Sequence, residues 1–129
     1  MFTKCAGALN SNMTSLNNNA SKYWKRQNWD VSVNSYGCSS GNGHCISWGP
    51  IVTLYAYLTP KVTGSNLTLA SVANEISPNI RMYMSTTASG TNPSGTASID
   101  PGGGILCHIP QSGFPITMWG TYYCEKIGG

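Results

Sequence analysis

FTKCAGALNSNMTSLNNNASKY, residues 2–23, is the stretch that decides the fold. Its apolar side chains recur at alternating intervals of four and three residues: Phe2, Ala6, Leu9, Met13, Leu16, Ala20 and Tyr23. This heptad spacing predicts a helix that buries one stripe against copies of itself. The residues between are mostly Asn, Ser and Thr, which form helices poorly, so we expect the helix to form only when it oligomerises or is extended. We therefore predict a coiled-coil stalk over residues 1–25.

After the stalk, the period of the apolar residues changes from seven to two, which indicates strands. Pro- and Gly-rich turns separate these segments. Strands are expected over residues 29–36, 44–48, 51–59, 67–72, 80–87, 96–100, 105–109 and 116–124, with a turn at 37–43 and a loop at 88–95. Seven or eight strands at this spacing predict a mainly β head over residues 26–129, an antiparallel β-sandwich of jelly-roll type.

The strand 51–59 has the clearest alternation, and both of its faces carry apolar or aromatic residues. Val52, Leu54, Ala56 and Leu58 share one face, which we assign to the core. The other face carries Ile51, Thr53, Tyr55 and Tyr57. In a sandwich, the outer face of each sheet contacts water and does not need apolar residues. This second face is therefore expected to contact a partner. A subunit interface and a ligand surface are both open at this point.

The charge of the chain is small, because only 11 of its 129 residues are Lys, Arg, Asp or Glu. A net charge of +3 without a long basic run argues against nucleic-acid binding. No stretch has the apolar length that a membrane-spanning helix needs, and residues 1–20 lack the basic start and continuous apolar run of a signal peptide. Ser, Thr, Asn and Gly supply most of the polar surface instead, as in rigid β proteins outside cells and in virion appendages.

Five cysteines cannot all pair within one chain. Cys38 and Cys45 flank a Gly-rich hexapeptide, so a hairpin would bring them face to face, and the strands that carry Cys107 and Cys124 could be neighbours. Zinc binding would use Cys38, His44 or Cys45, Cys107 and His108, but no C-x2-C or H-x3-H spacing supports it. We expect no metal and no cofactor, and we expect the thiols to be buried as small apolar groups.

Candidate catalytic groups are sparse in this sequence. A glycosidase needs two carboxylates flanking the scissile bond, and only Asp100 with Glu75 or Glu125 could supply them in the β region. Asp100 precedes Pro-Gly-Gly-Gly and is more simply a turn residue. Neither His44 nor His108 lies in a nucleophile-elbow context. We therefore expect a protein that is not an enzyme.

Several segments together resemble a known family. They are the polar heptad helix, Trp48-Gly49-Pro50-Ile51-Val52-Thr53-Leu54, Leu69-Ala70, Ser77-Pro78-Asn79-Ile80-Arg81, the turn glycines Gly95 and Gly104, and Gly120-Thr121-Tyr122-Tyr123. Over about residues 44–125 the chain resembles the C-terminal head domain of tailed-bacteriophage tail fibres and receptor-binding proteins. The resemblance implies a homotrimer at a phage tail tip or fibre, made in the host bacterial cytoplasm, which contacts other tail proteins and adsorbs to a bacterial cell-surface polysaccharide. It carries over no individual site residue, and Cys38 and Cys45 depart from the family pattern.

Carbohydrate binding commonly uses aromatic rings, on which the C–H faces of a sugar stack. We predict a glycan site on the strand faces opposite the core, at Tyr55, Tyr57, Arg81, Tyr83 and Trp119. The same aromatic patch could instead form the threefold interface, where aromatic residues are also enriched, and the loops at 88–95 and 100–104 are another possible binding rim. A purely structural virion component and a small secreted lectin are the alternative functions.

Overall fold

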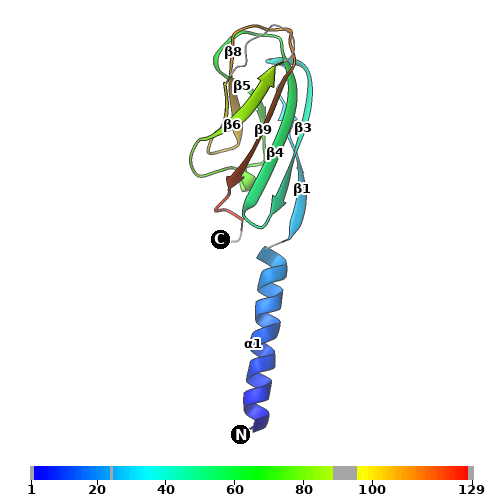
Figure 1. Cartoon of the computed structure of the whole chain (residues 1–129), viewed down its shortest axis with the longest axis vertical. Helices are drawn as coiled ribbons and strands as arrows, with labels where there is room; N and C mark the ends of the chain where they lie inside the picture. Colours follow the sequence, from blue (N-terminus) through cyan, green and yellow to red (C-terminus); the bar gives the residue numbers. More distant parts are fainter. Residues whose placement is uncertain (1, 24, 89–95, 128–129) are drawn as a thin grey trace.

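The computed structural model describes residues 2–23, 25–88 and 96–127, without the side chains of residues 2–4, 18–23 and 88. A single helix, α1 (Phe2–Tyr23), stands beneath a β head (Figure 1). Only residues 24 and 25 separate the end of α1 from the first strand. The helix thus ends at Tyr23 and the first strand begins at Arg26, while the division into a coiled-coil stalk and a head domain stays a prediction.

The described side chains of α1, at residues 5–17, are all exposed in the single chain. Leu9, Met13 and Leu16 expose 61%, 55% and 68% of their surface. Ala6 lies on the same stripe, whereas the side chains of Phe2, Ala20 and Tyr23 lie outside the described residues. Helical stability in proteins comes mostly from packing, so the described part of this stripe, which is exposed, stabilises the helix little within the single chain.

The described residues of the head, 25–88 and 96–127, form nine strands, one more than the seven or eight that the sequence predicts. Their bounds are β1 Arg26–Asp30, β2 Ser32–Val33, β3 Cys38–Trp48, β4 Ile51–Pro60, β5 Gly64–Ser71, β6 Met82–Ala88, β7 Thr96–Ile99, β8 Gly104–Ile109 and β9 Ile116–Tyr123. A short 3-10 turn, η1 (Asn74–Ile76), lies between β5 and β6. The segments predicted at 51–59, 80–87, 96–100, 105–109 and 116–124 all coincide with strands to within two residues at each end.

All strand pairs are antiparallel, in the order β1-β3-β4-β9-β6-β7-β8-β5-β2. The sheet curls until it is nearly closed into a barrel (Figure 1). Two segments turn the corners. β6 pairs with β7 through residues 82–84 and with β9 through residues 85–88. Residues 26–33 pair first with β3 and then, after the buried Val31, with β5.

The core lies inside this barrel and follows the predicted alternation. Val52, Leu54, Ala56 and Leu58 of β4 are completely buried. They pack in one cluster with inward side chains from the other strands, among them Leu69, Ile99, Ile105 and Met118. Burying such side chains contributes roughly 1.5–3 kcal/mol each, and it supplies the main stabilisation of the head.

The predicted turn at residues 37–43 is wrong. The chain turns earlier, where the side chain of Asn34 accepts a hydrogen bond from Tyr36 N and its carbonyl accepts one from Cys38 N. β3 then runs through the glycine-rich stretch and pairs with β4 along its whole length, apart from a bulge at Cys38–Ser40. A Cβ on Gly43 would lie 2.7 Å from the carbonyl oxygen of Tyr55. These glycines therefore allow close approach of two strands and do not mark a loop.

Both proposed cysteine neighbourhoods are wrong as well. Cys38 and Cys45 lie on the same strand, β3, and so cannot face each other across a hairpin. β8 and β9, which carry or precede Cys107 and Cys124, are not adjacent in the sheet. The four cysteines of the head are buried as free thiols, as predicted, and Cys5 on α1 is exposed. Burial raises the pKa of Cys45 to about 12, and burial together with the nearby Cys38 thiol raises that of Cys107 to about 12.

We expect these thiols to make the stability of the head sensitive to alkali. In the unfolded chain a thiol ionises above its ordinary pKa of about 9, whereas the folded state keeps Cys45 and Cys107 protonated up to about 12. The folded pKa is raised, so this stability is present below pH 9 and is lost as the pH rises from 9 to 12. Between pH 8 and 10.5 we expect the free energy of unfolding to fall by about 2 kcal/mol for each thiol.

Urea unfolding under reducing conditions at a series of pH values measures this loss. The double variant Cys45→Ala, Cys107→Ala is the control. Its free energy of unfolding should be lower at pH 8 but should decline less steeply above pH 9. Equal slopes in the two proteins would show that the two thiols do not control alkaline stability.

Candidate functional site

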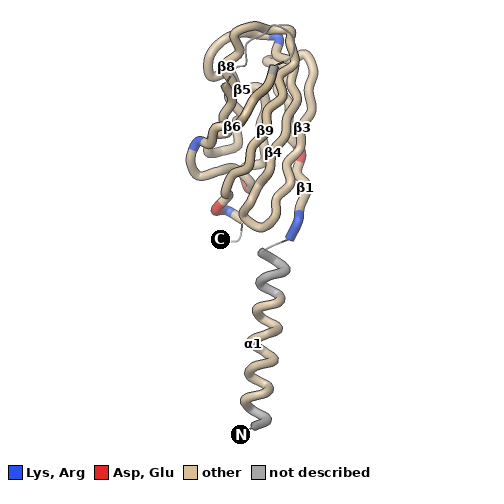
Figure 2. The backbone as a smooth tube through the Cα atoms, viewed as in Figure 1, with Lys and Arg blue, Asp and Glu red and all other residues tan. Residues whose placement is uncertain are grey.

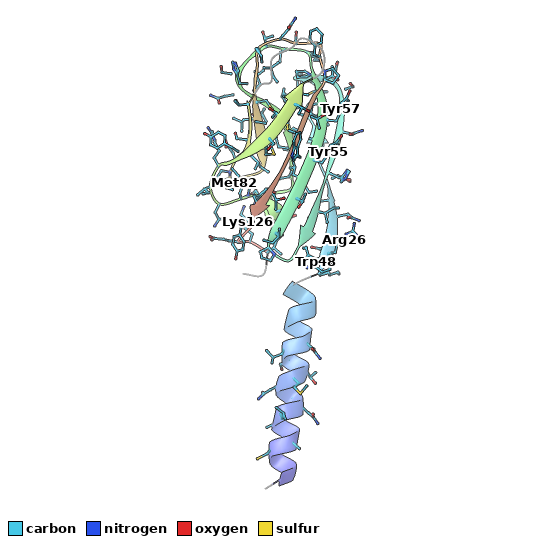
Figure 3. All side chains as sticks on the ribbon, in the orientation of Figure 1. Arg26, Trp48, Tyr55, Tyr57, Met82 and Lys126 are labelled. Carbon is cyan, nitrogen blue, oxygen red and sulfur yellow. The ribbon has the colours of Figure 1, made fainter. Side chains whose placement is uncertain are left out.

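The outward side of β1, β3, β4, β9 and the second half of β6 forms one broad surface, which we call the outer face. Inward and outward residues alternate along each strand, so the buried side of β4 fixes which residues lie on the other side. Tyr55, Tyr57 and Trp119 of the predicted glycan site lie on this face, each about 40% exposed. Tyr55 and Tyr57 are labelled on β4 in Figure 3.

Tyr55 lies at the centre of a line of five residues that crosses five strands. The register pairs Asp30 with His44, His44 with Tyr55, Tyr55 with Trp119, and Trp119 with Ser85. All five are exposed. Directly paired residues on one face have Cβ atoms about 4.5–5.5 Å apart, so neighbouring side chains along the line can contact one ligand. The rings of His44 and Tyr55 are 6.0 Å apart, tilted by 40°. We call this line the central row.

The rows on either side of the central row are mostly hydroxyl and amide groups. One consists of Asn28, Ile46, Thr53 and Thr121, and the other of Asn42, Tyr57, Thr117 and Thr87. We call them the flanking rows. The hydroxyls of Thr53 and Thr121 are 3.2 Å apart and hydrogen-bonded to each other. The side chains of Tyr55 and Trp119 are therefore bordered on both sides by groups that can donate and accept hydrogen bonds.

Another row of paired residues lies at the end of the head nearest the helix. It consists of Arg26, Trp48, Ile51 and Tyr123, and we call it the stalk-proximal row. Figure 3 labels Arg26 and Trp48 at this end. Trp48 and Tyr123 are more than half exposed. The outer face thus has a largely apolar end beside α1, with Arg26 at its edge, and a mixed aromatic and polar region farther from it.

The outer face carries little charge. Among the central, flanking and stalk-proximal rows, only Asp30 and Arg26 are charged. Figure 2 shows no charged residue along β4 or β9, the two central strands of the face. Asp30 lies at one end of the central row and Arg26 lies next to the stalk. The face is thus suited to an uncharged partner.

Arg81 and Tyr83, the other two predicted site residues, are farther round the barrel. Tyr83 is 77% exposed and pairs with Ser98 of β7, on the first half of β6, which does not pair with β9. The Arg81 guanidinium donates to both carboxylate oxygens of Asp100, at 2.6 and 3.0 Å. This pairing, chiefly through hydrogen bonding, raises the pKa of Arg81. Arg81 therefore pairs with the residue that begins the 100–104 turn and lies apart from Tyr55 and Trp119, and its part in binding a glycan stays a prediction.

The groups considered for catalysis and zinc do not converge. Cys38 and Cys107 point into the core, whereas His44 and His108 are exposed on the outside of the barrel. Within the described part of the chain, no three His, Cys, Asp or Glu side chains are grouped as metal ligands. His108 Nδ1 lies 3.0 Å from the Ser65 hydroxyl.

The three carboxylates considered for glycoside hydrolysis lie in different surroundings. Asp100 is held by Arg81, and Glu125 accepts a hydrogen bond of 2.6 Å from Asn79. Glu75 belongs to η1.

Neither a family model nor a curated protein matches this chain. In the described residues, no helix combines the length and the apolar character needed to cross a membrane.

Sequence reasoning missed Asp30, His44, Ser85 and the threonines of the flanking rows. Their signal in the sequence is weak, because each is an ordinary polar residue at an outward strand position. Only the register between strands places them beside Tyr55 and Trp119. The tight turn between Trp48 and Ile51 sets the register of β3 on β4, and the bend in β6 sets where its pairing with β9 begins.

Proposed function

We propose that this protein is a non-catalytic receptor-binding head that adsorbs to a bacterial surface glycan. The observation that carries the proposal is the direct pairing of Tyr55 with Trp119 on an exposed, nearly uncharged sheet face. Two adjacent rings offer the flat apolar surface on which pyranose C–H faces stack. The neighbouring Thr and Asn side chains offer hydrogen bonds for sugar hydroxyls. Such shallow sites bind weakly one at a time.

Multivalency would compensate for weak single sites. The exposed stripe Ala6, Leu9, Met13 and Leu16 supports self-association through α1. We propose a parallel trimer in which α1 forms the coiled coil and the barrels are the jelly-roll-like heads of a phage tail fibre or tail-tip protein. Three linked heads raise the effective affinity for a repetitive surface by about 10²–10⁴ without any new contact.

The two stacking rings provide the test. Tyr55→Ala and Trp119→Ala are each expected to weaken binding at least tenfold per head, because truncating a central aromatic anchor costs more than about 1 kcal/mol. Fluorescently labelled protein can be titrated onto capsulated and thick-walled bacterial cells and onto their purified polysaccharides. Tyr36→Ala is the control, since Tyr36 is 87% exposed in the turn between β2 and β3 and belongs to none of the rows of the outer face.

The oligomeric state should be measured on every variant. Unchanged binding by both ring variants, with the oligomer intact, would contradict a glycan site on this face. Absence of binding by the wild-type protein to any cell or polysaccharide would favour a structural virion component instead.

A further inference from the structure

We propose that the central row holds one extended, unbranched and uncharged glycan strand, which crosses β1, β3, β4, β9 and β6 at right angles. This inference rests on the proposed glycan-binding function and specifies its ligand. Tyr55 and Trp119 stack on sugar rings near the middle of the strand. Asp30 and His44 hydrogen-bond hydroxyls toward one end, and Ser85 does so toward the other.

The dimensions of the row call for several sugar units. Its five residues span four inter-strand spacings of about 4.8 Å, which is about 19 Å in total. A single pyranose covers only the two central rings and leaves the groups at both ends of the row without a partner. Affinity should therefore increase as an oligosaccharide grows to the length of the row and should then level off.

The charges around the row favour a neutral ligand. No Lys or Arg lies in the central or flanking rows, and the one ionisable carboxylate among them, Asp30, would repel an acidic sugar. The flanking rows offer Thr and Asn side chains, whose dipoles suit hydroxyl groups. Phosphorylated or carboxylated polymers are thus poorly matched to this face.

A second copy of the chain is the competing occupant, and the distribution of side chains argues against it. Subunit contacts are expected to continue the apolar stripe of α1. The stalk-proximal row lies at that end of the head, where Figure 3 labels Trp48, and the register places Ile51 and Tyr123 beside it. The central row lies farther along the strands, between rows of hydroxyls and amides. Burying those groups in a dry interface would cost free energy unless every one found a partner.

Titration calorimetry with the full chain tests the proposal. Purified neutral and anionic bacterial polysaccharides are screened first, and the polymer that binds is then cut into fragments of one to six sugar units. We expect a neutral polymer to bind, and we expect affinity to rise at least tenfold between one and four units. Soluble fragments report affinity per head, so avidity does not contribute.

Variants at the ends of the row give the sharper result. Asp30→Ala and Ser85→Ala should each weaken binding of the longest fragment three- to tenfold and leave binding of a single unit unchanged. Ser32→Ala, at an exposed position of β2, is the matched control for Ser85→Ala and should have no effect.

The outcomes separate the inference from the proposed function. Binding of no polysaccharide at all overturns both. Binding that depends on Tyr55 and Trp119 but not on fragment length, Asp30 or Ser85 overturns the extended strand and leaves the glycan-binding function standing. Preference for an anionic polymer overturns the neutral ligand.

Discussion

Replacement of Leu9 and Leu16 by Asp is expected to convert the proposed trimer into monomers. In the single chain both side chains lie on the helix surface, more than 60% exposed. In a three-stranded coiled coil the two positions are buried at the seam, where six carboxylates per trimer would face one another without partners. Burying an unpaired charge costs several kcal/mol, more than a helix this poor in helix-forming residues can offset. α1 should then unfold, because its described side chains, at residues 5–17, are all exposed and do not pack on the head.

Analytical ultracentrifugation at micromolar concentration measures the assembly, and far-ultraviolet circular dichroism measures the helix. Ser11→Asp with Ser15→Asp is the matched control, because it adds the same charge to the same helix at positions outside the apolar stripe. That control should remain a trimer. A wild-type protein that sediments as a monomer, or a Leu9, Leu16 variant that stays assembled, would show that α1 does not join the chains.

The same variant should affect adsorption to cells more than it affects binding of a soluble sugar. Loss of linked heads removes the effective concentration that a trimer provides, so binding to a surface should fall by about 10²–10⁴. Affinity for a short soluble oligosaccharide should stay within about twofold, since the outer face is unchanged. Equal losses in both assays would mean that the site itself depends on contacts between heads.

The sequence predicted those parts of the fold in which a residue's local preference matches the position that the folded protein gives it. Alternation along residues 51–59 identified the buried side of β4, because only one face of that strand can enter the barrel. The Pro-Gly-Gly-Gly turn at residues 101–104 was also predictable, since Asp100-Pro101 and three glycines favour a reversal of the chain. Seven-residue spacing likewise predicted the extent of α1, which ends at Tyr23.

Prediction failed where a glycine has a tertiary role. Gly41 and Gly43 look like turn residues in a linear pattern, yet they lie inside β3 because β4 passes too close for a Cβ. The residues that surround the candidate site could not be predicted for a related reason. Tyr55, Tyr57 and Trp119 could be identified as outward aromatic residues, but their neighbours His44 and Ser85 are set by the pairing register. A shift of one residue would replace His44 with Gly43 or the buried Cys45, and it would replace Ser85 with the half-buried Met84 or Thr86.

Gly103 offers a case in which two adjacent and similar glycines should differ strongly. Gly102 and Gly103 both adopt positive φ, at 97° and 100°. A Cβ on Gly102 would meet nothing within 4 Å, whereas one on Gly103 would overlap the carbonyl oxygen of Val72. Gly103 also accepts a hydrogen bond of 2.9 Å from Val72 N and donates one of 2.9 Å to the carbonyl of Asp100. It therefore ties the β7–β8 turn to the end of β5.

Gly103→Ala is accordingly expected to destabilise the head far more than Gly102→Ala does. Both substitutions force alanine into an unfavourable backbone region, at about 1–3 kcal/mol. Gly103→Ala adds the overlap with a backbone atom that cannot rotate away, at about 1–3 kcal/mol, and the loss of the Val72 hydrogen bond, at about 1 kcal/mol. Urea unfolding monitored by tryptophan fluorescence should thus place Gly103→Ala roughly 2–4 kcal/mol below Gly102→Ala. Because a domain of this size has only about 5–15 kcal/mol of stability, Gly103→Ala should be largely unfolded at elevated temperature while Gly102→Ala stays folded. Equal stabilities would mean that the turn does not dock on β5 as the close approach to Val72 requires.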